Sequence, residues 1–215
     1  MKKIFDDVFE NLGVILLFIN ALLYSYSYLK NKKDKALRYF SIYLNLTFLV
    51  LSLSIVIIEY FNKTNNLFLS HFYFIFQFIF LSLFYKKFFT KTQKNWVNIN
   101  FVIITVILVI QYYSNVSLFY KFNLLEILIT SLPLVIYSII HLYNSLGKPG
   151  KYMYINSAIL IYLSVSTLIF ILGNLINSID RSLANNVWVL NKVFYIGYLL
   201  LILFEWRISL WKTKN

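Results

Sequence analysis

The amino-acid sequence predicts an all-α, polytopic membrane protein built as a bundle of seven transmembrane helices. Of its 215 residues, 60% are hydrophobic and only 13% are charged. A chain of this size folded in water keeps a large exposed surface, and so apolar a composition cannot cover it with polar groups. Long stretches without Asp, Glu, Lys or Arg recur, and basic residues gather between them. We therefore expect the bilayer to be the solvent and residues 1–215 to form a single transmembrane domain.

Each predicted span begins from a charge-free stretch of suitable length. A helix needs about 20 mostly apolar residues to cross the hydrocarbon. Six stretches meet this requirement: 11–29, 39–58, 64–85, 95–120, 127–147 and 152–179. A seventh segment, around 187–206, is uncharged from 193 to 204 and takes in Lys192 and Glu205 near its ends. The expected helices are 9–29, 38–60, 66–87, 96–115, 122–143, 152–175 and 186–208.

The third of these segments carries a pattern that resembles a β-strand. Phenylalanine occupies every second position from 72 to 80. In a membrane barrel the intervening residues would be polar and face the lumen. Of those residues, only Gln77 is clearly polar, since Ile75 and Ile79 are aliphatic. The uncharged stretch is also about twice the length of a barrel strand, so we predict a helix that is apolar all round.

The distribution of Lys and Arg predicts the orientation of the bundle. When the connections are assigned alternately to the two sides, 14 of these residues fall on one side and 5 on the other. The positive-inside rule makes the richer side cytoplasmic, with the N-terminus outside and the C-terminus in the cytoplasm. Acidic residues soon follow the initial Met-Lys-Lys, so we expect a retained first helix and no signal peptide. Short loops and this charge bias suit a bacterial inner membrane.

Composition also excludes several functions. The net charge of +12 lies in short clusters between apolar stretches, which does not suit a nucleic-acid partner. The chain has no cysteine and two histidines, too few for a zinc site with three histidine ligands. No hydrolase motif occurs, so we expect no catalytic residues, no metal and no cofactor; a membrane-embedded hydrolase is the enzyme class kept open. Lys192 lies too near a helix end for a retinal protein.

Polar residues within the predicted spans are the candidate functional residues, because polar groups are costly in hydrocarbon. Ser70, Tyr73 and Gln77 share one face of the third helix and are expected to face a cavity open to the outer side. The remaining candidates for this ligand pocket are Glu126, Asn174, Asn191 and Lys192, with Glu59 and His71 as secondary candidates. Lys192 is expected to pair with Glu126 or Glu59. The alternative is that these groups lie at the interface or join helices.

Two residues at the other end of the bundle are candidates for coupling. Glu205 and Arg207 close the last helix at the predicted cytoplasmic face, beside Trp206. They either transmit helix movement to a partner or anchor the helix at the interface. Both alternatives stay open at this stage.

Three segments of the chain resemble a known membrane module. They are NNLFLSHFYFIFQFIFLSLFYKKFF (65–89), YINSAILIYLSVSTLIFILGN (154–174) and LNKVFYIGYLLLILFEWRISL (190–210). These segments are similar to the seven-helix sensory module of Bacteroidota-type proteins, which occurs alone or ahead of a histidine-kinase domain. The resemblance implies a sensory input role and no catalytic residues. Because the sequence stops at Asn215, soon after the last predicted helix, we expect any kinase to be a separate polypeptide.

Three functions are compatible with this reading. The first is a receptor-like protein that binds a small or lipidic ligand from the outer side and signals to a cytoplasmic or membrane partner. The second is a non-catalytic accessory subunit of a larger membrane complex, and the third is a small permease. The expected partners are the lipid bilayer and either a separate signalling protein or another integral membrane protein.

Overall fold

The computed structural model is all-helical, and it describes residues 2–61, 65–147, 150–177 and 181–211. The side chains of residues 2–7, 174, 175, 177 and 181–185 lie outside this description. Within these described residues, seven helices are long and apolar enough to cross a membrane, which confirms the predicted seven-helix transmembrane architecture. They are α1 (Lys2–Lys30), α2 (Lys35–Glu59), α3 (Phe68–Tyr85), α4 (Lys91–Ser114), α5 (Leu124–Asn144), α6 (Met153–Asn177) and α7 (Arg181–Glu205). No strand occurs within the described ranges, and the phenylalanine-rich segment is helix α3.

Two short helical turns were not predicted. A 3₁₀ turn, η1 (Val116–Tyr120), follows α4, and a π-helical turn, η2 (Trp206–Leu210), extends α7. Helix α4 also begins at Lys91, ahead of the predicted residue 96. The reason is a capping box in which the Thr90 hydroxyl accepts the Gln93 backbone N–H and the Gln93 side chain accepts that of Thr90. A polar cap thus starts this helix before its apolar stretch.

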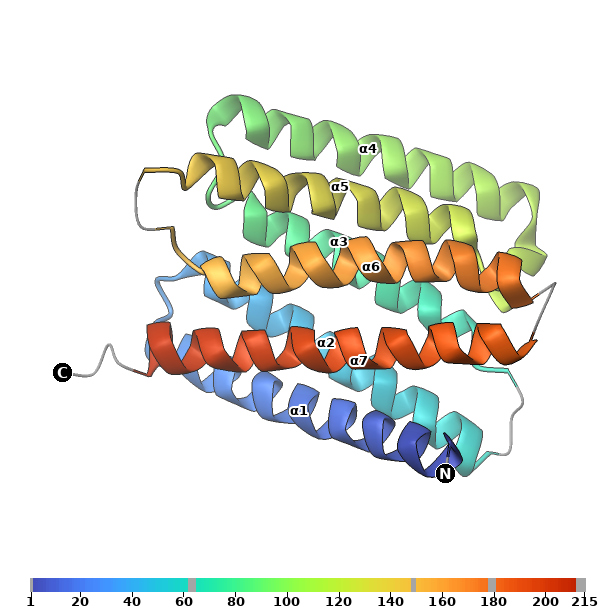
Figure 1. Cartoon of the computed structure of the whole chain (residues 1–215). Helices are drawn as coiled ribbons and strands as arrows, with labels where there is room; N and C mark the ends of the chain where they lie inside the picture. The colour runs from blue at the N-terminus through green and yellow to red at the C-terminus, as the bar shows by residue number, and fades with distance from the viewer. Residues whose placement is uncertain (1, 62–64, 148–149, 178–180, 212–215) are drawn as a thin grey trace.

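Six of the helices form a closed ring, and the seventh lies outside it. Around the ring the order is α1, α2, α3, α5, α6, α7, and α7 packs back against α1 (Figure 1). Helix α4 lies at the edge of the bundle and packs mainly on α5. Leu17, Phe40, Phe84, Ile159 and Leu199 are among the fully buried residues of the core inside the ring.

Polar contacts close the ring between its first and last helices. The Asn20 side-chain amide donates to the Leu199 carbonyl at 3.0 Å, and the Tyr24 hydroxyl donates to the Ile202 carbonyl at 2.9 Å. Further along, the Trp206 indole N–H donates to the Ser27 hydroxyl at 2.9 Å. Such side-chain bonds hold helices together where lipid removes the hydrophobic drive for association. The first and last helices, α1 and α7, are therefore joined side by side in the folded bundle.

A second polar network joins α3, α5 and α6. The Asn156 Oδ1 atom accepts from the Tyr85 hydroxyl at 2.9 Å and from the Ser138 hydroxyl at 2.8 Å. The Asn156 amide donates back to the Ser138 carbonyl at 3.2 Å. Tyr85, Ser138 and Asn156 are all fully buried. This network fixes the three helices against one another within the ring.

Helix α4 is attached in a different way from the ring helices. Val97 and Ile104 are its buried residues, so little apolar packing holds it. Side-chain bonds to α5 and to the segment before it supplement this packing. They are the reciprocal pairs Gln93–Asn144 and Gln111–Asn123, and a bond from Asn100 to the Tyr137 hydroxyl. The opposite face of α4 is exposed and apolar, as expected for a lipid-facing surface.

Candidate functional site

A cavity of about 340 Å³ opens among α2, α3, α6 and α7. Its lining residues belong to the parts of these helices nearer the end of the bundle where Figure 1 shows the N-terminus. Its walls are mainly apolar and include Leu69, Phe74, Phe122 and Phe170. Polar groups lie among these walls and come from α2, α3, α6, α7 and the residues before α3. They are Thr47, Ser54, Asn66, Ser70, Tyr73, Tyr162, Asn191, Lys192 and Tyr195. The cavity is therefore apolar in its bulk and has hydrogen-bonding groups at defined points.

Helix α3 carries the predicted polar face formed by Ser70, Tyr73 and Gln77. This polar seam leads into the cavity. Ser70 and Tyr73 line it, and Gln77 lies one turn deeper, where it is buried. The Gln77 amide donates to the Tyr73 hydroxyl at 3.0 Å. The Ser70 hydroxyl is held by the Leu67 carbonyl at 2.6 Å. The spacing of the three residues along the helix places them together, as the sequence indicates.

A cluster of tyrosines surrounds the seam, and the sequence analysis missed it. Tyr162 and Tyr195 line the cavity beside Tyr73, with 5.5 Å between the Tyr162 and Tyr195 ring centroids. Behind them the Tyr198 hydroxyl donates to the Tyr43 hydroxyl at 3.1 Å. The signal in the sequence is the pair Tyr195 and Tyr198, three residues apart and therefore near one face of a helix. Both tyrosines stand in a stretch that is otherwise strongly apolar, so hydropathy alone does not single out their hydroxyls.

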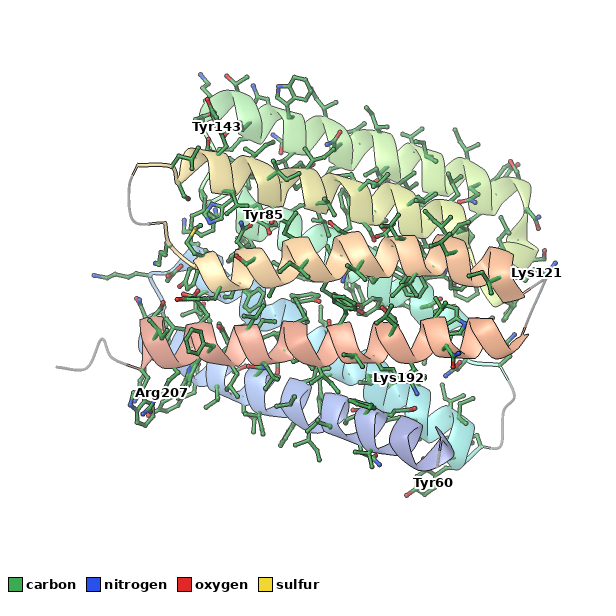
Figure 2. The ribbon with its side chains drawn as sticks, viewed as in Figure 1. Tyr60, Tyr85, Lys121, Tyr143, Lys192 and Arg207 are labelled. Atoms are coloured by element: carbon green, nitrogen blue, oxygen red, sulfur yellow. The ribbon has the colours of Figure 1, made fainter. Side chains whose placement is uncertain are left out.

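The ion pair at the mouth of the cavity differs from the predicted one. Lys192 Nζ lies 3.1 Å from Glu10 Oε2, a residue of α1. The expected partners lie elsewhere, since Glu126 pairs with His71 and Glu59 is exposed at the end of α2. Asn191, next to Lys192, has a buried Oδ1 atom with no hydrogen-bond partner among the described residues. Figure 2 labels Lys192 in the part of α7 nearer the N-terminal end of the bundle.

Glu126 and His71 form a second cluster that is separate from the cavity. His71 Nδ1 lies 2.5 Å from Glu126 Oε2, and both residues are buried. The Tyr112 hydroxyl donates to the same carboxylate oxygen at 2.7 Å. His71 Nε2 lies 3.1 Å from the Phe119 carbonyl of η1. The placement of Glu126 in the ligand pocket is thus corrected, because its helix face turns toward α3 and α4 and away from α7.

Asn174 is the remaining candidate for the pocket. Its backbone belongs to α6 near the cavity end of that helix. Its side chain lies outside the described residues, so the structure assigns it no contact.

The coupling candidates at the opposite end have unequal surroundings. Glu205 is buried, and its carboxylate accepts the backbone N–H of Tyr154 at 2.8 Å and the Ser209 hydroxyl at 2.5 Å. Tyr154 is in the first turn of α6, where backbone N–H groups lack partners within the helix. Arg207 is exposed and lies over the Trp211 ring, 5.3 Å from its centroid. Glu205 therefore ties the end of α7 to the start of α6.

A third cluster joins two connections at this end of the bundle. Asp34 caps α2 by accepting the backbone N–H groups of Ala36 and Leu37, both at 3.0 Å. Its other oxygen accepts from Lys151 at 2.5 Å and from the Tyr152 hydroxyl at 2.6 Å. Burial alone would raise the pKa of Asp34, but the bonds from Lys151, Tyr152 and the Leu37 backbone outweigh it and lower the pKa. The carboxylate is thus held in its charged form.

No protein-family model, curated protein or solved structure matches the chain. The cavity and the three polar clusters are therefore the observations on which a function can be argued.

Proposed function

We propose that this protein is a receptor-like protein of a bacterial inner membrane that binds a small amphipathic ligand in the cavity among α2, α3, α6 and α7. The observation that carries the proposal is the cavity itself. Its volume of about 340 Å³ lies in the range of small-molecule sites, which are roughly 300–1,000 Å³ and mostly apolar with a few placed polar groups. The tyrosine hydroxyls and the Asn191 side chain, which line the cavity, supply those polar groups.

The walls indicate the chemistry of the ligand. Phe74, Phe122 and Phe170 offer an apolar surface to a hydrocarbon or ring, and Tyr73 and Asn191 can bond to a polar end group. A volume of about 340 Å³ is near the lower end of the range for small-molecule sites, so we propose a small ligand such as a short-chain amphiphile.

The distribution of basic residues supports entry from the outer side. The alternating assignment of the connections gives 5 Lys and Arg residues to the end that carries the cavity, where Lys192 of α7 also lies, and 14 to the other end. The positive-inside rule places the first end outside, together with the N-terminus, and the C-terminus in the cytoplasm. A ligand of the outer leaflet or the outer solution would therefore meet the cavity first.

Helices α6 and α7 offer a route from the cavity to the cytoplasmic end. Both line the cavity, and at the far end Glu205 joins them through the Tyr154 backbone. Figure 2 shows Lys192 and Arg207 toward opposite ends of α7 and its extension. A ligand that shifts α7 against α6 would move the exposed Arg207 region, where a separate signalling protein can bind. This is the coupling role proposed for Glu205 and Arg207.

The proposal is tested by ligand binding in lipid nanodiscs, with 1-decanol and decanoate as probes. Trp188 packs on Phe170, a wall of the cavity, with 5.6 Å between ring centroids, so its fluorescence reports occupancy. We expect a saturable change for at least one probe, and its loss in Ser70→Phe, which fills the cavity. Ser114→Phe, on the exposed end of α4, is the matched control and should respond as the wild type does. A response that is unsaturable, or that persists in Ser70→Phe, would refute the proposal.

The second candidate is an accessory subunit of a membrane complex, and α4 is the observation that favours it. This helix lies outside the ring and presents a long exposed apolar face. A partner protein could cover that face in place of lipid. Native mass spectrometry after gentle extraction from the protein's own membrane separates the two ideas. An abundant stoichiometric complex lost on Val102→Asn and Val106→Asn, both on the exposed face, would support the subunit role.

A further inference from the structure

A basic pocket lies at the end of the bundle opposite the N-terminus, where Figure 1 shows the α1–α2, α3–α4 and α5–α6 connections. Residues from all three connections line it. Its volume of about 490 Å³ lies within the roughly 300–1,000 Å³ of small-molecule sites. The charged side chains in its lining are Lys33, Asp34, Lys35, Lys87 and Lys151. Four cations and one carboxylate thus surround a single space.

The carboxylate of Asp34 is occupied within the fold. Its Oδ1 atom accepts the backbone N–H groups of Ala36 and Leu37, both at 3.0 Å. Its Oδ2 atom accepts from Lys151 at 2.5 Å and from the Tyr152 hydroxyl at 2.6 Å. The side chain is only 8% exposed, so it offers little free surface to the pocket. Asp34 therefore neutralises Lys151 and leaves the charges of the other lysines in place.

The other three lysines of the pocket have no acidic partner in the part of the chain that the structure describes. Lys33 and Lys35 are exposed, and Lys87 lies over the Tyr39 ring, 5.4 Å from its centroid. Glu205 is the second acid that the sequence assigns to this end, and it is buried and bonded to other groups. Like charges around one space repel each other, and an anion placed between them removes that repulsion.

The backbone around the pocket is held in place before any anion arrives. Tyr152, next to Lys151, has a φ of 59°, a conformation that residues with a side chain rarely adopt. Tyr152 is buried, and its hydroxyl bond to Asp34 fixes its position. The His141 imidazole donates from Nε2 to the Lys151 carbonyl at 3.0 Å. An incoming anion therefore has little backbone to order, which favours binding.

We propose that this basic pocket binds a phosphate-bearing anion at the end of the bundle assigned to the cytoplasm. A phosphate monoester carries roughly −1.5 to −2 charges near pH 7, which suits the charges of Lys33, Lys35 and Lys87. Two sources carry this group: the head group of an anionic phospholipid in the adjacent leaflet and a soluble phosphorylated molecule. The basic pocket shares no lining residue with the ligand cavity, so the proposal is independent of the receptor function.

The first measurement is titration calorimetry with inorganic pyrophosphate, on the whole protein in phosphatidylcholine nanodiscs. We expect saturable binding to the wild type. Lys33→Gln combined with Lys87→Gln should weaken binding about tenfold, because each exposed ion pair contributes about threefold. Lys32→Gln combined with Lys91→Gln is the matched control. Both control residues are exposed lysines outside the pocket lining, so the net charge changes equally and the affinity should stay within about twofold of the wild type.

A second measurement separates the two sources of phosphate. The wild type and both double variants are released from nanodiscs that contain phosphatidic acid, and native mass spectrometry counts the lipids that stay bound. Loss of bound phosphatidic acid in the Lys33→Gln, Lys87→Gln variant alone would assign the site to a lipid head group. Equal retention in all three proteins, with a pyrophosphate affinity that depends on the pocket, would assign it to a soluble molecule.

Two results would overturn the proposal. The first is a pyrophosphate affinity that falls equally in the pocket variant and in the control, since net charge alone would then explain it. The second is absence of pyrophosphate binding together with equal retention of phosphatidic acid. Melting temperatures check that the variants are folded. If loss of Lys87 from the Tyr39 ring lowers the melting temperature, Lys33→Gln combined with Lys35→Gln replaces the pocket variant.

Discussion

The buried Asn156 network allows a quantitative prediction. Substitution Asn156→Ala removes three side-chain hydrogen bonds, two accepted from Tyr85 and Ser138 and one donated to the Ser138 carbonyl. A side-chain bond between membrane helices contributes on average about 0.6 kcal/mol. The Tyr85 hydroxyl is also left without its acceptor in a buried site, at a cost of about 1 kcal/mol. The expected loss in the free energy of unfolding is about 3 kcal/mol.

The assay is reversible unfolding in mixed micelles with a matched set of variants. Asn95→Ala, at an exposed position of α4, is the same chemical change without a network and should cost less than about 0.5 kcal/mol. Tyr85→Phe should cost about 0.6 kcal/mol, and its coupling with Asn156→Ala should be of the same size. If Asn156→Ala unfolds with the same free energy as Asn95→Ala, the network does not stabilise the ring and the reasoning fails.

Three further predictions concern other parts of the bundle. Because the pKa of Asp34 is lowered in the folded protein, its contribution to stability is present above the ordinary pKa of 3.8 and is lost as the pH falls through the folded value. The difference in melting temperature between wild type and Asp34→Asn should therefore vanish well below pH 4. A difference that stays constant with pH would contradict this. Gly150→Ala should destabilise by about 1–2 kcal/mol in a thermal-shift assay, because its Cβ would lie 2.8 Å from a serine Cβ, while Gly13→Ala, with its nearest contact at 3.5 Å, should be neutral or stabilising. Lys192→Met and Glu126→Gln belong to separate sites, so their losses in unfolding free energy should add within about 0.5 kcal/mol, and a larger coupling would show that the two sites communicate.

The helices follow from the sequence because lipid makes apolar length the dominant signal. Six charge-free stretches are long enough to span the bilayer, the seventh segment takes in Lys192 and Glu205 near its ends, and the seven observed spans overlap the seven expected ranges. The ends of the helices were harder to predict, because they depend on capping residues that the length of an apolar stretch does not indicate. The Thr90 and Gln93 capping box moved the start of α4 into a polar stretch, and η1 formed within residues expected to belong to a loop.

The candidate site was predictable within one helix and not between helices. Ser70, Tyr73 and Gln77 share a face because their spacing follows the helical period, and the structure keeps them together. The predicted partner of Lys192 was wrong because ion pairing between helices depends on which helix faces turn toward each other. Depth in the bilayer placed Glu126 and Lys192 at a similar level, but α5 turns Glu126 toward His71. The position of a residue in the sequence indicates its depth in the bilayer, but it does not determine how its helix is rotated about its own axis.

The closed ring also has a consequence for how the protein is made. Asn20 and Tyr24 find their acceptors on α7, which emerges after α1 to α6 during synthesis. Until then the α1 side chains must satisfy their polar groups with water, with lipid head groups or with a helper protein. We therefore expect α1 to wait in the membrane through the insertion of five further helices. Ribosome-bound chains halted before Arg181 should expose Asn20 to crosslinking by the insertion machinery, and chains in which α7 has been inserted should not.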